Sequence, residues 1–336
     1  MRQYLSERLL LFVPVIFGIL VLTFIISHLV PGDPAAAYAG IGATKQQLLA
    51  IRKEFGLDKP LYVQFLSYIG DLLHGDLGKS IRTRRPVLED IKQYAPATIE
   101  LGLVALFLSC TFGIVFGVLS AMYRNRLVDH ILRLFALVGR AAPSFWIGLL
   151  GLLVFFRVLD WLPWGGRISD SIAPPSFKTG LYILDSLLSG NWRALGSSVM
   201  HMILPASTLA ISRIGYLLRI QRAILLEVLT KQYLMVARAK GLRERTVIWK
   251  HGFRNALIPI ITVVSLSLGG ILGGSFVVEL VFAWPGIGRY ATEAIIRLDF
   301  NAIIGASLMV AIAFSFANLL ADILYGIVDP RIRRMG

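Results

Sequence analysis

The chain has little charge and almost no cysteine. Only 16% of its 336 residues are charged and 56% are hydrophobic, whereas a soluble domain carries about 25% charged residues. The single cysteine, Cys110, excludes a disulfide framework and a metal cluster held by cysteines within one chain. The apolar residues gather in blocks of roughly 20, each long enough to cross a bilayer core. This pattern excludes a soluble globular enzyme, a disordered chain and a coiled coil.

Motifs for catalysis are also missing. The five histidines form no HExxH pair, and no G-x-S-x-G sequence presents a serine. The segment Leu73–Ser80 ends like a phosphate-binding loop, but Leu73 stands where that motif needs its first glycine. Gly286–Ala291 fits G-x-G-x-x-A without the βαβ unit that a dinucleotide site requires, so we interpret it as a turn. We therefore expect no catalytic residue, no metal site and no cofactor bound by this chain.

Six apolar blocks predict six transmembrane helices and an all-α polytopic membrane protein, because backbone groups in lipid must bond internally. The predicted spans are Leu9–Val30, Ile99–Met122, Ile131–Leu159, Met202–Leu226, Ile258–Phe282 and Ala302–Val328. Three pairs of glycines spaced by four residues lie in these blocks and favour close helix packing. They are Gly113/Gly117, Gly269/Gly273 and Gly270/Gly274.

The distribution of Lys and Arg predicts the orientation. With the N-terminus inside, the inner segments hold 15 Lys and Arg against 5 acidic residues in about 60 positions. The outer segments hold 14 against 12 in roughly twice that length. Since basic residues concentrate in cytoplasmic loops, both termini are expected in the cytoplasm. The net charge of +14 is then a result of topology, and we expect no nucleic-acid partner.

Two extracytoplasmic segments are expected to have structure of their own. In residues 31–96, Thr44 and Gln47 form a capping box for a helix through Phe55, and Pro60 starts a second helix. A third helix is expected to begin near Pro86 and to stop before Pro96, where the second span starts. The segment either packs on the ends of the spans or serves as a docking surface. Residues 160–200 combine a Pro/Gly-rich turn region with an amphipathic stretch, Leu181–Leu188.

Several ionisable residues lie within the spans or near their ends. Arg157, Arg219 and Arg222 lie close to span ends, where long side chains reach the interface. Arg140, Arg213 and Asp322 lie deeper, and such residues line a polar cavity, form structural pairs or extend to the interface. They are our candidates for a translocation path.

The longest inner segment, residues 227–257, is called the basic loop below. It contains Ala237-Arg-Ala-Lys-Gly241-Leu242, followed by His251-x-x-Arg-Asn-Ala256. Small residues between basic stretches suit a helix that presses into a partner's groove, and a solvated loop is the alternative. The pattern resembles the EAA loop of binding-protein-dependent ABC importer permeases of the dipeptide/oligopeptide/nickel branch. Met235 and Val236 replace the Glu and first Ala of the general motif, which is typical of the peptide branch.

The resemblance covers nearly the whole chain and is to the first-permease type. Further matching motifs are Pro31–Pro34, Leu57–Pro60, His74–Gly78, Pro143–Trp146, His201–Pro205, Phe282–Gly286 and Asp329–Arg331. The resemblance implies the type I importer fold, with one permease domain over residues 1–336. Within it, residues 1–30 hold the first span, 31–96 an extracytoplasmic helical segment, and 97–330 a five-span core that contains the basic loop.

The resemblance also implies the partners and the function. These are a homologous second permease, two cytoplasmic ATPase subunits that use ATP and Mg²⁺, an extracytoplasmic binding protein and the lipid bilayer of a bacterial inner membrane. The chain itself would be no enzyme. Its coupling residues to the ATPase would be Val236, Ala237, Arg238, Ala239, Lys240, Gly241 and Leu242.

Peptide is the expected substrate class, with nickel, glutathione and oligosaccharide as alternatives within the branch. A secondary transporter would show inverted repeats with broken helices, and a membrane hydrolase would need a catalytic constellation. We find neither in the sequence.

Overall fold

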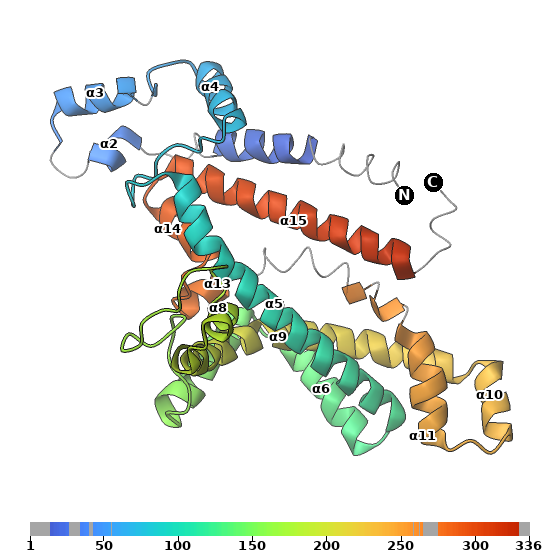
Figure 1. Ribbon diagram of the computed structural model, residues 1–336. Coiled ribbons are helices and arrows are strands. Elements are labelled where there is room, and N and C mark those ends of the chain that lie inside the picture. The colour runs from blue at the N-terminus through green and yellow to red at the C-terminus, as the bar shows by residue number, and fades with distance from the viewer. Residues whose placement is uncertain are drawn as a thin grey trace. The chain divides into compact units, whose positions relative to one another are not determined.

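The computed structural model describes residues 14–26, 34–39, 43–54, 56–257, 259–261, 263–264 and 275–328, and regular structure in these ranges is helical apart from an isolated bridge between Lys79 and Pro86. The first helix that the structure describes is apolar and covers Pro14–Ile26. The helices that follow (Figure 1, where most are labelled) are α2 (Pro34–Ala39), α3 (Lys45–Glu54), α4 (Leu61–Leu73), α5 (Val87–Met122), α6 (Leu127–Ala141), α7 (Ser144–Gly151), the π-helical η1 (Leu152–Val158), α8 (Tyr182–Ser189), α9 (Trp192–Leu229), α10 (Gln232–Ala239), α11 (Glu244–Thr246), the π-helical η2 (Val247–Gly252), α13 (Phe276–Val281), α14 (Ile287–Ile296) and α15 (Phe300–Val328).

The helices belong to two compact units. The larger unit contains residues 99–284 and 314–336, and the smaller unit contains residues 2–98 and 285–313. Helices α5 and α15 contribute residues to both units.

Three helices are long and apolar enough to cross a membrane: α5, α9 and α15 over Phe300–Ala321. The bent pair of α6 with α7 and η1 makes a fourth when it is counted as one span. The described part of the predicted first span is the shorter helix Pro14–Ile26. Most of the predicted fifth span and the pairs Gly269/Gly273 and Gly270/Gly274 lie outside the described residues. The all-helical membrane architecture is confirmed, and the count of six stays a prediction.

The third predicted span is not one straight helix. It divides into α6 and the α7–η1 helix, which meet at an angle of 109°. Pro143 explains the break, because its ring disfavours helical geometry in the residue before it. Ala142 is accordingly extended, with φ −76° and ψ 131°, and Pro143 caps the start of α7.

Pro96, in contrast, does not interrupt its helix. The sequence predicted that a short helix stops before Pro96, but α5 continues through it from Val87 to Met122. Ala95 and Ala97 on either side are buried, and Thr98 accepts a 2.8 Å hydrogen bond at Oγ1 from the backbone N–H of Ile287. This packing stabilises a continuous helix, although Pro96 has no backbone N–H and cannot donate the helical hydrogen bond.

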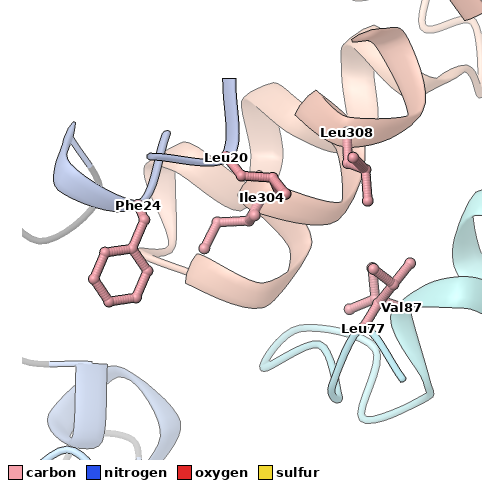
Figure 2. Close-up of a cluster of buried hydrophobic side chains, with 6 residues drawn as sticks. All are labelled: Leu20, Phe24, Leu77, Val87, Ile304 and Leu308. Carbon is pink, nitrogen blue, oxygen red and sulfur yellow. The ribbon is translucent and has the colours of Figure 1, made fainter. Parts of the chain in front are cut away.

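The smaller unit has an apolar core between distant parts of the sequence. Figure 2 shows its six buried side chains, which are Leu20, Phe24, Leu77, Val87, Ile304 and Leu308. Phe65, Tyr68 and Leu72 of α4 pack against this cluster. The capping box at α3 is confirmed, since Gln47 accepts from the Thr44 N–H at 2.9 Å and donates its own N–H to Thr44 Oγ1 at 3.3 Å. The predicted start of α4 after Pro60 is confirmed as well.

Small residues let α5 and α6 approach α9 closely in the larger unit. A Cβ placed on Gly117 would lie 2.5 Å from the Gln221 Cβ, and one on Gly113 would lie 2.7 Å from the Leu217 Cβ. On α9 itself, a Cβ on Gly215 would lie 2.7 Å from the backbone oxygen of Ala136 in α6. The prediction that Gly113 and Gly117 serve helix packing is therefore confirmed.

Candidate functional site

The basic loop forms a helix–turn–helix that returns to α9. Helix α10 is followed by a turn at Lys240 and Gly241, and α11 and η2 lead back through the helical residues 253–257. Gly241 has φ +75°, a conformation that only glycine adopts without strain. Of the implied coupling residues Val236–Leu242, residues 236–239 belong to α10, and Lys240 and Gly241 form the turn after it.

An apolar base fixes the loop to the long helices. Val118 and Ala121 of α5 pack with Leu225 of α9 and with Ile248 and Ala256 of the returning segment. Helix α10 contributes one fully buried side chain, Leu234. The Asn255 amide also donates to the Tyr233 hydroxyl at 2.9 Å, which joins the returning segment to α10.

Arg238 stabilises the turn through hydrogen bonds to residues of the same segment. Its Nε and Nη2 donate to the two oxygens of Glu244 at 3.1 and 2.8 Å, and its Nη1 donates to the Leu229 backbone oxygen at 3.2 Å. The hydrogen bonds from Arg238 lower the pKa of Glu244 below its ordinary value. Arg238, one of the coupling residues implied by the resemblance, is thus engaged within the loop itself.

The outer side of the loop is apolar and exposed. Met235 and Val236 are 53% and 54% exposed. Tyr233, Leu242 and Trp249 are exposed as well. Ala239 and Gly241 lie at the surface beside them, while Ala237 is half-buried. We call the five exposed apolar or aromatic side chains the loop face; they are Tyr233, Met235, Val236, Leu242 and Trp249, on a segment that is otherwise basic.

A cavity of about 300 Å³ lies in the larger unit, among the long apolar helices. It brings together two candidates from the sequence, Arg140 of α6 and Arg213 of α9. The other lining residues are Leu106, Ser109, Cys110, Ser212, Tyr216, Leu217 and Val264. The guanidinium carbon of Arg140 lies 5.5 Å from the centre of the Tyr216 ring, within the range of a cation–π interaction. Of the alternatives for these arginines, lining a polar cavity is the one that this geometry favours.

The loop, the long helices and the internal cavity agree with a known family. Residues 113–334 match the inner membrane components of binding-protein-dependent transport systems, and residues 1–102 match the N-terminal part of such membrane components. The chain belongs to this family.

Relatives of this permease align over their full length. It is 47% identical over 332 residues to the probable D,D-dipeptide transport system permease protein DdpB of Escherichia coli (strain K12), covering 99% of this chain and 98% of that protein. It is 41% identical over 334 residues to the dipeptide transport system permease protein DppB of Alkalihalophilus pseudofirmus, covering 99% and 100%. It is 40% identical over 334 residues to the di/tripeptide transport system permease protein DppB of Pseudomonas aeruginosa (strain UCBPP-PA14), covering 99% of each.

These matches confirm the resemblance to importer permeases of the first-permease type. They place the chain in the inner membrane as the permease component, which is distinct from the ATPase component of such a transporter.

The remaining ionisable candidates in the permease have different outcomes. Arg157 and Arg219 are exposed, in agreement with side chains that extend outward. Arg222 instead pairs with the buried Asp129 of α6, donating from Nε and Nη2 at 2.9 Å each. This pairing was not predicted, and the expectation that Arg222 reaches the membrane interface stays a prediction. The Asp322 side chain lies outside the described residues.

The sequence analysis missed a buried ion pair on the side of the permease that it predicts to be extracytoplasmic. Arg167, in the Pro/Gly-rich region, donates to the Glu100 carboxylate and, at 2.9 Å, to the Gly180 backbone oxygen. Its guanidinium carbon lies 3.7 Å from the centre of the Tyr182 ring. Glu100 also accepts the Ile183 backbone N–H at 2.7 Å. One feature of the sequence indicated such a pair: Glu100 is an acidic residue at the start of the predicted apolar span Ile99–Met122, and a buried carboxylate needs a partner nearby.

A second network lies in the smaller unit and explains the segment that resembled a phosphate-binding loop. Ser80 donates to the buried Asp299 at 2.6 Å, and Arg82 pairs with Glu293. Arg82 also lies over the rings of Tyr94 and Tyr290, which stack at 5.1 Å. The segment is therefore held by carboxylates of its own chain, which gives it a structural role.

Proposed function

We propose that this permease imports short peptides as one half of an ATP-driven, binding-protein-dependent transporter. The supporting observation is the end-to-end similarity to relatives whose names specify dipeptides, D,D-dipeptides or di/tripeptides. In this proposal the chain acts as one permease domain with six spans and both termini in the cytoplasm. A homologous permease completes the path, an extracytoplasmic binding protein delivers the peptide, and two ATPase subunits use ATP and Mg²⁺.

The basic loop is the proposed contact with the ATPase. The loop face offers exposed apolar side chains of the kind that protein interfaces bury at their centre. Leu234 and the Arg238–Glu244 pair hold α10 to the rest of the loop. A displacement of α10 by the ATPase would therefore move α9, because η2 and residues 253–257 pack on the same apolar base. This arrangement suits a segment that transmits motion to the membrane helices.

Reconstituted vesicles test the proposal directly. The chain is co-expressed with its second permease, its ATPases and its binding protein, and the transporter is placed in vesicles. Uptake of radiolabelled Ala-Ala is then measured with ATP enclosed in the vesicles. We expect uptake that needs both ATP and the binding protein. Uptake of Ni²⁺, glutathione or an oligosaccharide in place of Ala-Ala would redirect the substrate assignment. Uptake that persists without the ATPases would contradict the importer class.

A further inference from the structure

The cavity in the larger unit has an unusual balance of charge. Its lining contains two guanidinium groups and, among the residues that the structure describes, no carboxylate. Ser109 and Cys110 of α5 and Ser212 and Tyr216 of α9 add polar atoms to the lining. Arginines within a membrane span are costly, and they persist where they line a water-filled cavity or serve a charged ligand.

Arg140 is held in place by an aromatic ring. Its guanidinium carbon lies 5.5 Å from the centre of the Tyr216 ring, and no described carboxylate forms an ion pair with it. A ring contact orients the guanidinium plane but occupies none of its hydrogen-bond donors. Arg140 is therefore positioned to donate to an oxyanion, and Arg213 contributes a second charge from the facing helix α9.

We propose that this cavity is an anion-binding site that takes the free C-terminal carboxylate of the peptide during its passage. This inference rests on the proposed function and adds the group of the substrate that the permease recognises. The planar guanidinium fork matches a carboxylate in two parallel hydrogen bonds. A volume of about 300 Å³ is at the lower end of ligand pockets. It therefore suits one end of a short peptide, with the apolar Leu106, Leu217 and Val264 beside it.

Cys110 provides a reporter inside the cavity. It is the single cysteine of the chain and lies in the lining with both arginines. In the assembled transporter, two methanethiosulfonate reagents are compared, one with an anionic sulfonatoethyl group and one with a cationic trimethylammonium group. Modification of this chain is followed by its mass shift. The same thiolate attacks the sulfenyl sulfur of either reagent, forming a mixed disulfide and releasing methanesulfinate. The ratio of the two rates therefore cancels changes in the reactivity of the thiol and reports the local potential.

We expect the anionic reagent to react faster in the wild type. Arg140→Gln and Arg213→Gln should each lower the anionic-to-cationic ratio, by about tenfold for a charge that focuses the potential of a cavity. Arg140→Lys and Arg213→Lys keep the charge and should keep the ratio. Arg157→Gln is the matched control, because Arg157 is exposed on η1 and is not part of the lining.

Peptide protection identifies the group that is recognised. Millimolar Ala-Ala should slow modification of Cys110, whereas Ala-Ala amide, which lacks the carboxylate, should not. Equal protection by both peptides, or a ratio unchanged in both Gln variants, would overturn the anion site. If Cys110 does not react, Ser109→Cys and Ser212→Cys in a Cys110→Ser background take its place, and failure of all three would show that no open cavity exists. An intact ratio in a transporter that takes up no peptide would instead reject the proposed substrate and keep the anion site.

Discussion

Arg222 of α9 donates hydrogen bonds of 2.9 Å from Nε and Nη2 to the two carboxylate oxygens of Asp129 at the start of α6. Asp129 is fully buried, and it also accepts from the Ser120 hydroxyl of α5 and from the Asn125 backbone N–H. The pair thus joins three helices, α5, α6 and α9, just before the basic loop begins.

Asp129→Asn should lower the thermal stability of the purified transporter at pH 7. It leaves Arg222 without its carboxylate, and breaking one side of a buried pair costs about 3 kcal/mol or more. Thermal melts of the purified wild type and variant at pH 7 measure the difference.

Asp170→Asn is the control for this pair, because Asp170 is exposed in the 160–181 loop. It should melt like the wild type at pH 7. A wild-type melting temperature for Asp129→Asn at pH 7 would show that the pair adds nothing to stability.

Gly117→Ala should destabilise the contact between α5 and α9. Its Cβ would lie 2.5 Å from the Gln221 Cβ and 2.9 Å from the Leu218 backbone oxygen, so the helices must separate. Overpacking of this kind costs about 1–3 kcal/mol. Gly196→Ala on α9 meets nothing within 4 Å and should be neutral or slightly stabilising, since Ala favours the helix by up to about 1 kcal/mol. Thermal melts of both variants side by side decide the matter; equal melting temperatures would mean that close packing at Gly117 is unimportant.

Local features of the fold were predictable from the sequence because they depend on neighbouring residues. The capping box at Thr44, the helix start after Pro60 and the positive φ of Gly241 all follow from short-range chemistry. Pro143 and Pro96 show the limit of prediction from neighbouring residues. Pro143 separates α6 from α7 by a 109° bend, whereas Pro96 lies inside the continuous α5. The difference comes from packing around Pro96, which a single sequence does not display.

The same limit applies to the candidate site. Arg140 and Arg213 were found because a charge inside an apolar block is conspicuous in the sequence. The partners of Arg167 and Arg222 were not found, because Glu100 and Asp129 are separated from them by 67 and 93 residues. Only the helix packing decides which arginine meets a carboxylate and which lines a cavity.

The Arg238–Glu244 pair should behave as an internal brace of the basic loop. Arg238→Glu and Glu244→Arg should each reduce ligand-stimulated ATP hydrolysis, because each places like charges at the turn. The double variant restores an opposite pair and should recover most of the activity. The pair is exposed, so each loss of stability should be modest, about 1 kcal/mol or less. If Arg238 instead pairs with an acidic group on the ATPase, the double variant will stay as impaired as Arg238→Glu.

The predicted orientation can be tested with single cysteines in a Cys110→Ser background. Cysteines in place of Gly70 and Pro175 should react with a membrane-impermeant maleimide added to intact spheroplasts. A cysteine in place of Lys231 in the basic loop should react only after the membrane is opened. A reporter fused after Arg333 should be active in the cytoplasm. Labelling of residue 70 from the inside alone would reject the orientation with the N-terminus in the cytoplasm.

Gly241→Asp and Ala237→Asp should uncouple the permease from its ATPase. Each places a charge beside the loop face, and burying an unpaired charge at an interface costs several kcal/mol. Membrane insertion and docking of the binding protein should stay normal, whereas ATPase association, or its ligand-stimulated activity, and peptide uptake should be lost. Co-purification and ATP hydrolysis in reconstituted vesicles measure both effects.

Two controls separate charge from backbone strain and from a general effect of acidity. The Asn side chain resembles that of Asp in shape and tolerates positive φ about as well, but it carries no charge. Gly241→Asn should therefore retain more ATPase association than Gly241→Asp. Gln232→Asp adds the same charge at the exposed start of α10, where the helix dipole favours it, and should couple normally. Transport at the wild-type rate by Gly241→Asp would show that the loop face does not contact the ATPase, because an interlocked surface cannot accept a buried charge without loss.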